Sequence, residues 1–324
     1  MNKNKAEILL ELIACSVRKK EQIRFDGQEI LIRGSSGHFG MWTTLMLAYE
    51  KYSGKSLRIS CETSRLDYVN SILKPLGLLG SVQPYREGAR FDIIFDFTLP
   101  PHDSSKHPDF EFCTQILSNL EASMLKVIKG SGILVSPSSG AVYGHYRHLD
   151  LPKSEQIATT AKNRGTYGDM KYLVETLSAG VDHLRMPIFR VFSTFGPLFR
   201  PDSNLVANKI FIRDPKTKLF TLGGEGKKIR NFAFIGELVF QIIYLTLMHE
   251  NQAQEPINIG TADCLSIYDF ASRIGSYNGV TIHKGLNSEA DEYYFPELTL
   301  LRHFYNQHET SIDRYIELTS RYYE

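Results

Sequence analysis

Cysteine is scarce in this sequence. Only four occur among 324 residues, Cys15, Cys61, Cys113 and Cys264, and none of them forms a CxxC pair. This spacing suits neither a disulfide framework nor a zinc site. We therefore expect reduced thiols, a cytoplasmic location and no metal.

Long apolar runs are missing as well. The apolar stretch near the N-terminus is bordered by Glu7 and interrupted by Glu11, which predicts an amphipathic helix and not a secretory signal. The longest later run, Leu238 to Met248, contains Gln241 and is too short to cross a bilayer. We expect no membrane segment.

An excess of either charge is also lacking. The chain has 37 lysines and arginines against 36 aspartates and glutamates, a formal net charge of +1 at pH 7. It therefore has no overall field that would attract nucleic acid or an anionic membrane. We expect no nucleic-acid partner, and an anionic ligand must be held by local features of the fold.

Short apolar runs alternate with helical segments in the first half of the chain. Strands are predicted at 29–33, 57–61, near 82, at 91–95 and at 132–136, and helices at 41–51, 66–73 and 110–129. This alternation is typical of parallel βαβ units, so we predict an α/β fold with a doubly wound parallel sheet of Rossmann type.

The second half is less regular. It has predicted strands within 182–191, at 219–222 and at 257–259, and an apolar helix at 237–250. We predict a dinucleotide-binding domain at residues 1–185, with returning segments at about 228–262. Residues 186–324 would form mainly a smaller C-terminal substrate-binding lobe.

A glycine-rich loop separates the first predicted strand from the following helix. It reads Gly34-Ser-Ser-Gly37-His-Phe-Gly40, a GxxGxxG pattern. The first glycine permits a tight turn, the second lets the backbone approach a pyrophosphate, and the third allows close helix–strand packing. The free N–H groups at the helix N-terminus favour phosphate binding. The candidate cofactor-binding residues here are Gly34, Ser36, Gly37, His38, Phe39 and Gly40.

The end of the second predicted strand leaves the choice of dinucleotide open. An acid at this point favours the 2′-hydroxyl of NAD, whereas an arginine accommodates the 2′-phosphate of NADP. The segment Cys61-Glu62-Thr-Ser-Arg65 contains both. Glu62 and Arg65 are therefore both candidates, and the cofactor is NAD or NADP.

Serine, tyrosine and lysine occur in a suggestive order. Ser138-Ser139-Gly140-Ala-Val-Tyr-Gly144 follows the strand at 132–136, and Tyr167-Gly-Asp-Met-Lys171 opens a predicted helix. Residues four apart lie on one helix face, which brings Tyr167 and Lys171 together.

With the later segments included, the chain resembles the extended short-chain dehydrogenase/reductase superfamily, in its sugar-nucleotide epimerase and dehydratase branch. The later motifs are Arg190-Val-Phe-Ser-Thr-Phe-Gly-Pro197, similar to RxxNxYGP, and Gly223-Gly-Glu-Gly226 with the segment from Arg230 to Val239. Ile257-Asn-Ile-Gly260 is similar to the family's YNxG.

This resemblance implies the roles of individual residues. Tyr167 would take the proton of a sugar hydroxyl, Lys171 would supply charge and hold the nicotinamide ribose, and Ser139 would bind the same sugar oxygen. A phenol titrates near pH 10, and the ammonium and an oxidised nicotinamide would lower the pKa of Tyr167. Thr98 would contact the cofactor, and the substrate-binding candidates are Ser139, Ser193, Asn208 and Arg230.

The chain also departs from the family. Gly140 and Ala141 stand where dehydratases carry Asp-Glu, and decarboxylating relatives also keep a glutamate in that region. Both absences argue against the usual dehydratase and decarboxylase mechanisms. Asp96 begins the segment that resembles the HxAA loop, and Ser193 replaces the asparagine of RxxNxYGP. These two changes leave three alternatives open: an unusual substrate, looser cofactor binding or a lost activity.

The resemblance therefore favours an NAD(P)-dependent sugar-nucleotide epimerase that acts through a keto-sugar intermediate. A keto-sugar reductase and an atypical dehydratase are the enzyme alternatives, and a dinucleotide-binding protein without catalysis is the third. Relatives dimerise through two helices, and the matching segments here are about 110–129 and 167–179. They carry more apolar residues than one buried stripe needs, among them Leu117 and Leu120, so we expect these at the interface of a homodimer.

Overall fold

The computed structural model describes most of the chain. The described residues are 1, 3–17, 23–98, 110–127, 132–144, 152–156, 164–182, 184–199, 205–212, 216, 218–248, 255–288, 292–305 and 310–324, and the side chain of Cys113 is not among them.

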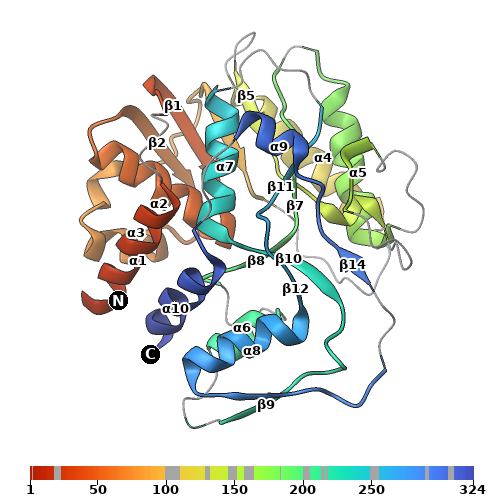
Figure 1. The fold of residues 1–324 in the computed structure, drawn as a ribbon. Coiled ribbons are helices and arrows are strands. Elements are labelled where there is room, and N and C mark those ends of the chain that lie inside the picture. The colour runs from red at the N-terminus through yellow and green to blue at the C-terminus, as the bar shows by residue number, and fades with distance from the viewer. Residues whose placement is uncertain are drawn as a thin grey trace.

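A parallel sheet forms the centre of the N-terminal part (Figure 1). Five strands pair in the order β3-β2-β1-β4-β5: β1 (Asp26–Arg33), β2 (Ser56–Glu62), β3 (Val82–Pro84), β4 (Ile93–Asp96) and β5 (Ile133–Val135). A bridge from Ile133 to Arg185 joins them to a second parallel set, β11-β7-β6. This set consists of β6 (Ser138–Ser139), β7 (Phe189–Val191) and β11 (Ile257–Ile259). The predicted doubly wound α/β fold is confirmed.

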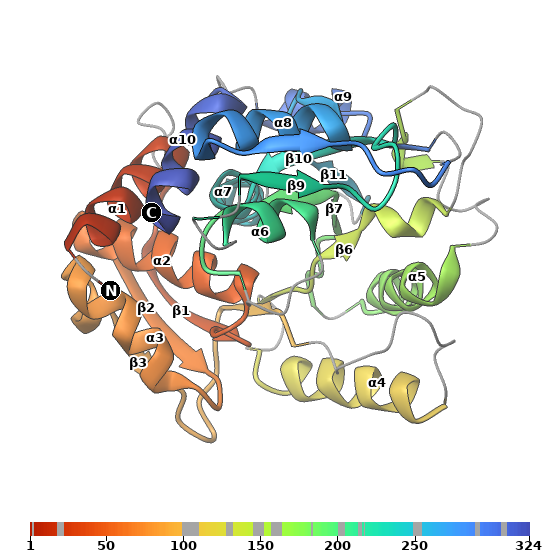
Figure 2. The same cartoon turned by 90° about the horizontal axis from the view of Figure 1, so that it is seen from below.

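Helices cover both faces of this sheet, because parallel strands are buried on both sides. Ile30 and Ile32 of β1 pack into the large core under α1 (Lys3–Ser16), α2 (His38–Tyr52), α3 (Leu66–Leu73) and α7 (Ile235–Met248). Leu31 points to the opposite face, into a smaller core beneath α4 (Phe110–Met124) and α5 (Gly165–Ala179). Figure 2 shows α4 and α5 as neighbours. Short 3-10 turns are at Lys74–Leu76 (η1), Leu79–Ser81 (η2) and Gly140–Tyr143 (η3).

The C-terminal part builds smaller sheets beside the first. Strand β10 (Ile229–Phe234) pairs with β8 (Ser193–Phe195), β12 (Cys264–Ser266) and β14 (Tyr293–Tyr294), and β9 (Leu219–Thr221) pairs with β13 (Thr281–His283). Its helices are α6 (Val206–Phe211), α8 (Ile267–Asn278), α9 (Thr299–Phe304) and α10 (Ile312–Tyr323).

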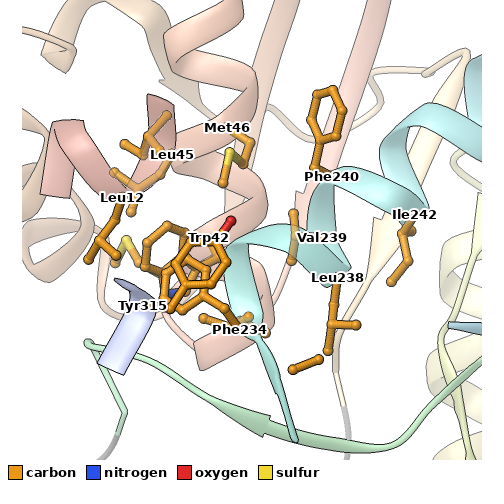
Figure 3. Close-up of a cluster of buried hydrophobic side chains, with 14 of the residues drawn as sticks. Leu12, Trp42, Leu45, Met46, Phe234, Leu238, Val239, Phe240, Ile242 and Tyr315 are labelled. Atoms are coloured by element: carbon orange, nitrogen blue, oxygen red, sulfur yellow. The ribbon is translucent and has the colours of Figure 1, made fainter. Parts of the chain in front are cut away.

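The two parts share one continuous core. Helix α7 packs against α2, and α10 packs against both α1 and α8. In Figure 3, Trp42 of α2 lies beside Phe234 of β10 and Tyr315 of α10, and Leu238 of α7 belongs to the same core. The boundary near residue 185 remains a prediction. Within the described residues, no helix is long and apolar enough to span a membrane.

Helix α2 approaches β1 through the glycine loop. Gly34 has φ +72°, a backbone conformation that L side chains rarely adopt. A Cβ at Gly40 would lie 2.2 Å from the Gly34 carbonyl oxygen, so the first turn of α2 sits directly on the loop. This contact places the N-terminus of α2 at the carboxyl end of β1.

We predict that Gly40→Ala lowers the free energy of unfolding by about 1–3 kcal/mol, the usual cost of overpacking. Urea denaturation measures the loss. Gly80→Ala is the control, because a Cβ there has nothing within 4 Å, and it should change stability by about 0.5 kcal/mol or less. Equal effects of the two substitutions would contradict the close packing.

Candidate functional site

A cavity of about 430 Å³ lies at the carboxyl ends of the parallel strands. The strand order reverses beside β1, and such switch points are where open α/β sheets bind ligands. The glycine loop, the ends of β4, β5 and β7 and the first turns of α5 all contribute side chains. The lining residues are Gly37–Phe39, Asp96–Thr98, Ser136–Ser139, Tyr167, Lys171, Val191–Thr194, Leu205 and Tyr294.

The structure brings Ser139, Tyr167 and Lys171 together on the wall of this cavity. Ser139 is hydrogen-bonded to Tyr167, and its Oγ also accepts the backbone N–H of Ala141 at 3.2 Å. The Lys171 Nζ donates to the Pro137 carbonyl at 2.7 Å and lies 6.0 Å from the centroid of the Tyr167 ring. Their catalytic roles remain predictions.

The ionisation of this group differs from the sequence expectation. Burial lowers the pKa of Lys171 to about 8, and the nearby carboxylates of Asp96 and Glu175 oppose that shift. Burial raises the pKa of Tyr167, and the hydrogen bond with Ser139 offsets part of the rise. The expected lowering is therefore not found in the protein alone, because desolvation of the phenolate is the larger effect.

Tyr294 is a site residue that sequence reasoning missed. It lies on β14, opposite Arg230 of β10, and lines the cavity with its Oη 3.5 Å from Ser139 Oγ. Burial raises the pKa of Tyr294, so its hydroxyl stays protonated. Tyr294 belongs to no sequence motif and lies 155 residues from Ser139 in the chain. The pairing of β14 with β10 is what brings the two residues together.

The glycine loop fits a dinucleotide pyrophosphate. Gly37, His38 and Phe39 line the cavity, and Gly37 is the N-cap of α2, so the first turn of α2 opens onto it. Helix N-termini of this kind bind phosphates through their free N–H groups. Thr98 lines the cavity too, whereas Gly34 and Gly40 lie behind the loop and shape its turn.

Asp96 departs from the family pattern but is fully paired. Its Oδ2 accepts from Arg33 Nη1 at 3.0 Å and from Ser123 Oγ at 2.5 Å, and its Oδ1 accepts the N–H of Thr98 at 2.8 Å. Arg33 directly precedes the glycine loop and lies opposite Asp96 in the β1–β4 register. The buried charges of Arg33 and Asp96 therefore compensate one another.

The other predicted cofactor residues lie outside the cavity lining. Arg65 Nη2 donates to the Ser36 carbonyl at 3.1 Å, so these two residues are neighbours. Glu62 is held by Lys126, whose Nζ lies 2.8 Å from each carboxylate oxygen. The sequence contains no signal for the Glu62–Lys126 pair.

Only some of the candidate substrate-binding residues line the cavity. Ser139 and Ser193 line the cavity, but Asn208 and Arg230 do not. The amide of Asn208 is 1% exposed, and neither of its polar atoms has a hydrogen-bond partner among the described residues. Arg230 Nη2 donates to Glu292 at 2.7 Å, and its guanidinium lies 5.4 Å from the centroid of the cavity-lining Tyr294 ring.

His38 is neutral in the folded protein. Its ring stacks on Phe199 with centroids 3.4 Å apart, and Nε2 donates to the Pro197 carbonyl at 3.1 Å. Burial lowers the pKa of His38 from 6.5 to about 3. It therefore contributes packing, and no positive charge, to the cavity at neutral pH.

This pKa predicts acid sensitivity. Below pH 6.5 His38 becomes protonated in the unfolded chain but stays neutral in the folded protein. The contribution of neutral, buried His38 to the free energy of unfolding is therefore present above pH 6.5 and is lost as the pH falls towards 3. From pH 7.5 to 5.5, nucleotide-free protein should lose about 1.4 kcal/mol more than His38→Gln. Urea denaturation at both pH values measures the difference. The control, His283→Gln on exposed β13, should follow the wild type, and identical pH dependence in His38→Gln and wild type would refute the prediction.

Similar proteins were found by sequence and by structure. No family model matches the chain. UDP-glucuronic acid decarboxylase 1 from Arabidopsis thaliana is 26% identical over 191 residues, which cover 56% of this chain and 42% of that protein. The matched part thus spans less than half of the curated relative.

Solved structures match over most of the chain. A mutant of UDP-glucuronic acid 4-epimerase from Bacillus cereus, in complex with a fluorinated UDP-glucuronic acid and NAD, has a TM-score of 0.71 at 18% identity, covering 91% of this chain and 98% of that one. The dTDP-glucose 4,6-dehydratase from Bacillus anthracis in complex with NAD has a TM-score of 0.69 at 16% identity, covering 91% and 96%. The resemblance read from the motifs is confirmed: the chain has the fold of the extended short-chain dehydrogenase/reductase superfamily, and the proteins similar to it are sugar-nucleotide epimerases, dehydratases and decarboxylases of that superfamily.

Proposed function

We propose that this protein is an NAD(P)-dependent sugar-nucleotide epimerase that acts by reversible hydride transfer through a keto-sugar intermediate. The observation that carries the proposal is the meeting of Ser139, Tyr167 and Lys171 on one cavity wall, with the phosphate-binding end of α2 on the same cavity. A base, a charge and a hydroxyl donor at a dinucleotide site suit the oxidation of an alcohol.

Each side chain has a step that its surroundings support. Tyr167 takes the proton of the sugar hydroxyl and later returns it. Lys171 stays charged at neutral pH, since its pKa is about 8. Its ammonium favours ionisation of the Tyr167 hydroxyl, whereas burial raises the pKa of Tyr167. The Ser139 hydroxyl holds the sugar oxygen beside the Tyr167 hydroxyl. A nicotinamide held at this cavity would supply the reversible hydride acceptor.

Arg230 would bind the substrate diphosphate, as the resemblance implies, together with the Asn208 amide. In the structure Glu292 accepts from Arg230 at 2.7 Å and lies 3.4 Å from Lys228. A diphosphate must therefore replace a carboxylate at this arginine, and Arg230 suits that exchange because a guanidinium binds either group in the same planar manner.

Gly140 supports an epimerase over a dehydratase. A Cβ at this position would lie 2.6 Å from the ring of Phe192, so an aspartate where dehydratases carry theirs would have to displace this buried ring. Ala141, the next residue, has no proton to transfer. Without that acid and base, hydride and hydroxyl-proton transfer at Tyr167 are the chemistry that the cavity supports.

Purified protein should be incubated with UDP-glucose, UDP-glucuronic acid and dTDP-glucose, each with NAD⁺ or NADP⁺. An epimerase yields a sugar-nucleotide isomer of unchanged mass, with no net change in absorbance at 340 nm during turnover. Net formation of NAD(P)H, which is keto-sugar reduction run in reverse, would support the reductase alternative. Loss of water would support a dehydratase, and loss of carbon dioxide a decarboxylase. Dinucleotide binding with no turnover of any sugar nucleotide would favour the non-catalytic alternative.

We predict that Tyr167→Phe lowers turnover by about 10²–10⁴-fold, the usual contribution of a general acid–base, with dinucleotide affinity nearly unchanged. Product formation under saturating substrate and calorimetry with the dinucleotide measure the two effects. Tyr172→Phe is the matched control on the same helix, where the aromatic ring over Arg164 is kept. Near-normal turnover in Tyr167→Phe would rule out this mechanism.

We also propose a cytoplasmic homodimer. Helices α4 and α5 pack side by side through Ile116, Met170 and Val174, and the pair presents Leu117, which is 42% exposed. Leu120, expected at the interface, is instead 8% exposed within the subunit core. The described cysteines Cys15, Cys61 and Cys264 are free thiols, which suits a reducing compartment.

Sedimentation at micromolar concentration should give twice the chain mass of 36.9 kDa. Leu117→Asp should shift the protein towards monomer, because a charge would be buried at the helix pair. Leu219→Asp, at a leucine that is 49% exposed on β9, is the control and should remain dimeric. A monomeric wild type would refute the assembly.

A further inference from the structure

The acidic candidate for reading the adenosine ribose is already paired with two cations. Glu62 ends β2, and its Oε1 lies 2.8 Å from Lys126 Nζ. Its Oε2 lies 2.8 Å from the same ammonium and 3.1 Å from Arg33 Nε. Lys126 follows α4 and Arg33 ends β1, and their side chains are only 16% and 8% exposed.

This pairing removes the usual obstacle to a phosphate. A carboxylate at the end of β2 selects NAD because it accepts from the free 2′-hydroxyl and repels a 2′-phosphate. Here the two carboxylates of the network, Glu62 and Asp96, are matched by Arg33 and Lys126. The network is therefore neutral, and Glu62 presents no uncompensated charge to the ribose.

Arg65 adds a cation beside the glycine loop. It follows β2, is exposed, and donates one N–H of its guanidinium to the Ser36 carbonyl at 3.1 Å. A guanidinium has five N–H donors, so four remain for a ligand. Among the described residues, no carboxylate lies within ion-pair distance of Arg65, whereas Arg58 and Lys126 each have one and Arg33 has two.

Two hydroxyl groups complete the arrangement. Thr63 Oγ1 donates to Ser36 Oγ at 2.8 Å and accepts the backbone N–H of Arg65 at 3.1 Å. Because the Ser36 hydroxyl accepts from Thr63, its own proton is available to an anion. Ser36 lies between the first two glycines of the loop, so this donor sits next to the segment that binds the pyrophosphate.

We propose that Ser36, Thr63 and Arg65 form a subsite for the 2′-phosphate, and that this chain prefers NADP(H) to NAD(H). This inference rests on the proposed function only in requiring a dinucleotide at the glycine loop. It separates this chain from the similar proteins solved with NAD. Arg65 reads the phosphate, and Lys126 acts indirectly by holding Glu62.

Calorimetry with nucleotide-free protein tests the proposal without a sugar substrate. NADP⁺ should bind at least 10-fold more tightly than NAD⁺, the value of one charge-assisted hydrogen bond. Adenosine 2′,5′-bisphosphate should likewise bind more tightly than adenosine 5′-monophosphate. Tighter binding of NAD⁺ by the wild type would overturn the proposal.

Two variants separate the roles of the residues. Arg65→Ala should weaken NADP⁺ binding at least 10-fold and leave NAD⁺ affinity within twofold, whereas Arg58→Ala, on the exposed side of β2, should change neither. Lys126→Met should release Glu62 and lower the ratio of NADP⁺ to NAD⁺ affinity. Equal losses for both dinucleotides in Arg65→Ala, or an unchanged ratio in Lys126→Met, would contradict the assignment.

The outcome is independent of the sugar chemistry. A preference for NADP⁺ without turnover of any sugar nucleotide would remove the proposed epimerase activity and leave the subsite in place. Turnover of a sugar nucleotide together with a preference for NAD⁺ would support the epimerase activity and remove the 2′-phosphate subsite.

Discussion

A buried ion pair at the carboxyl ends of β1 and β4 underlies the organisation of the site. Arg33 and Asp96 lie opposite each other in the register of two central strands, and their side chains are 8% and 5% exposed. A single buried charge here would cost several kcal/mol, so each residue is tolerated only because the other is present. The glycine loop begins at the next residue after Arg33, and the cavity wall begins at Asp96.

The same pair links the two halves of the cofactor region. Arg33 also donates to Glu62, which brings the end of β2 into the network, and the Asp96 carboxylate favours the charged form of Lys171. One set of charges therefore acts on both Glu62 at the end of β2 and Lys171, the two regions proposed to meet the adenosine ribose and the substrate. Asp96, which stands where the family pattern has a histidine, is paired within this network by Arg33 and Ser123.

A second buried ion pair positions α5, the helix that carries Tyr167 and Lys171. Glu175 of α5 accepts from Arg190 of β7 at 2.9 and 2.7 Å, and Ser138 also donates to it. Because Glu175 lies one turn beyond Lys171, this contact holds the face of α5 that carries Lys171 and Tyr167 against the sheet. Arg190 begins the segment that resembles RxxNxYGP, and its contact with Glu175 gives it a structural role.

The sequence by itself determined the fold class and the local groupings. Strand and helix periodicity, the glycine spacing and the four-residue interval from Tyr167 to Lys171 are properties of neighbouring residues, so they are legible without the fold. Only the tertiary structure decided which distant segments are in contact. Arg33 meets Asp96, and Glu62 meets Lys126, across about 60 residues of sequence. Tyr294 meets Ser139 across 155 residues. The burial of Leu120 in the core and the pairing of Arg230 with Glu292 also depend on the tertiary structure. Such contacts depend on strand order and register, which a single sequence does not encode in any local pattern, and they decide which charges a ligand meets.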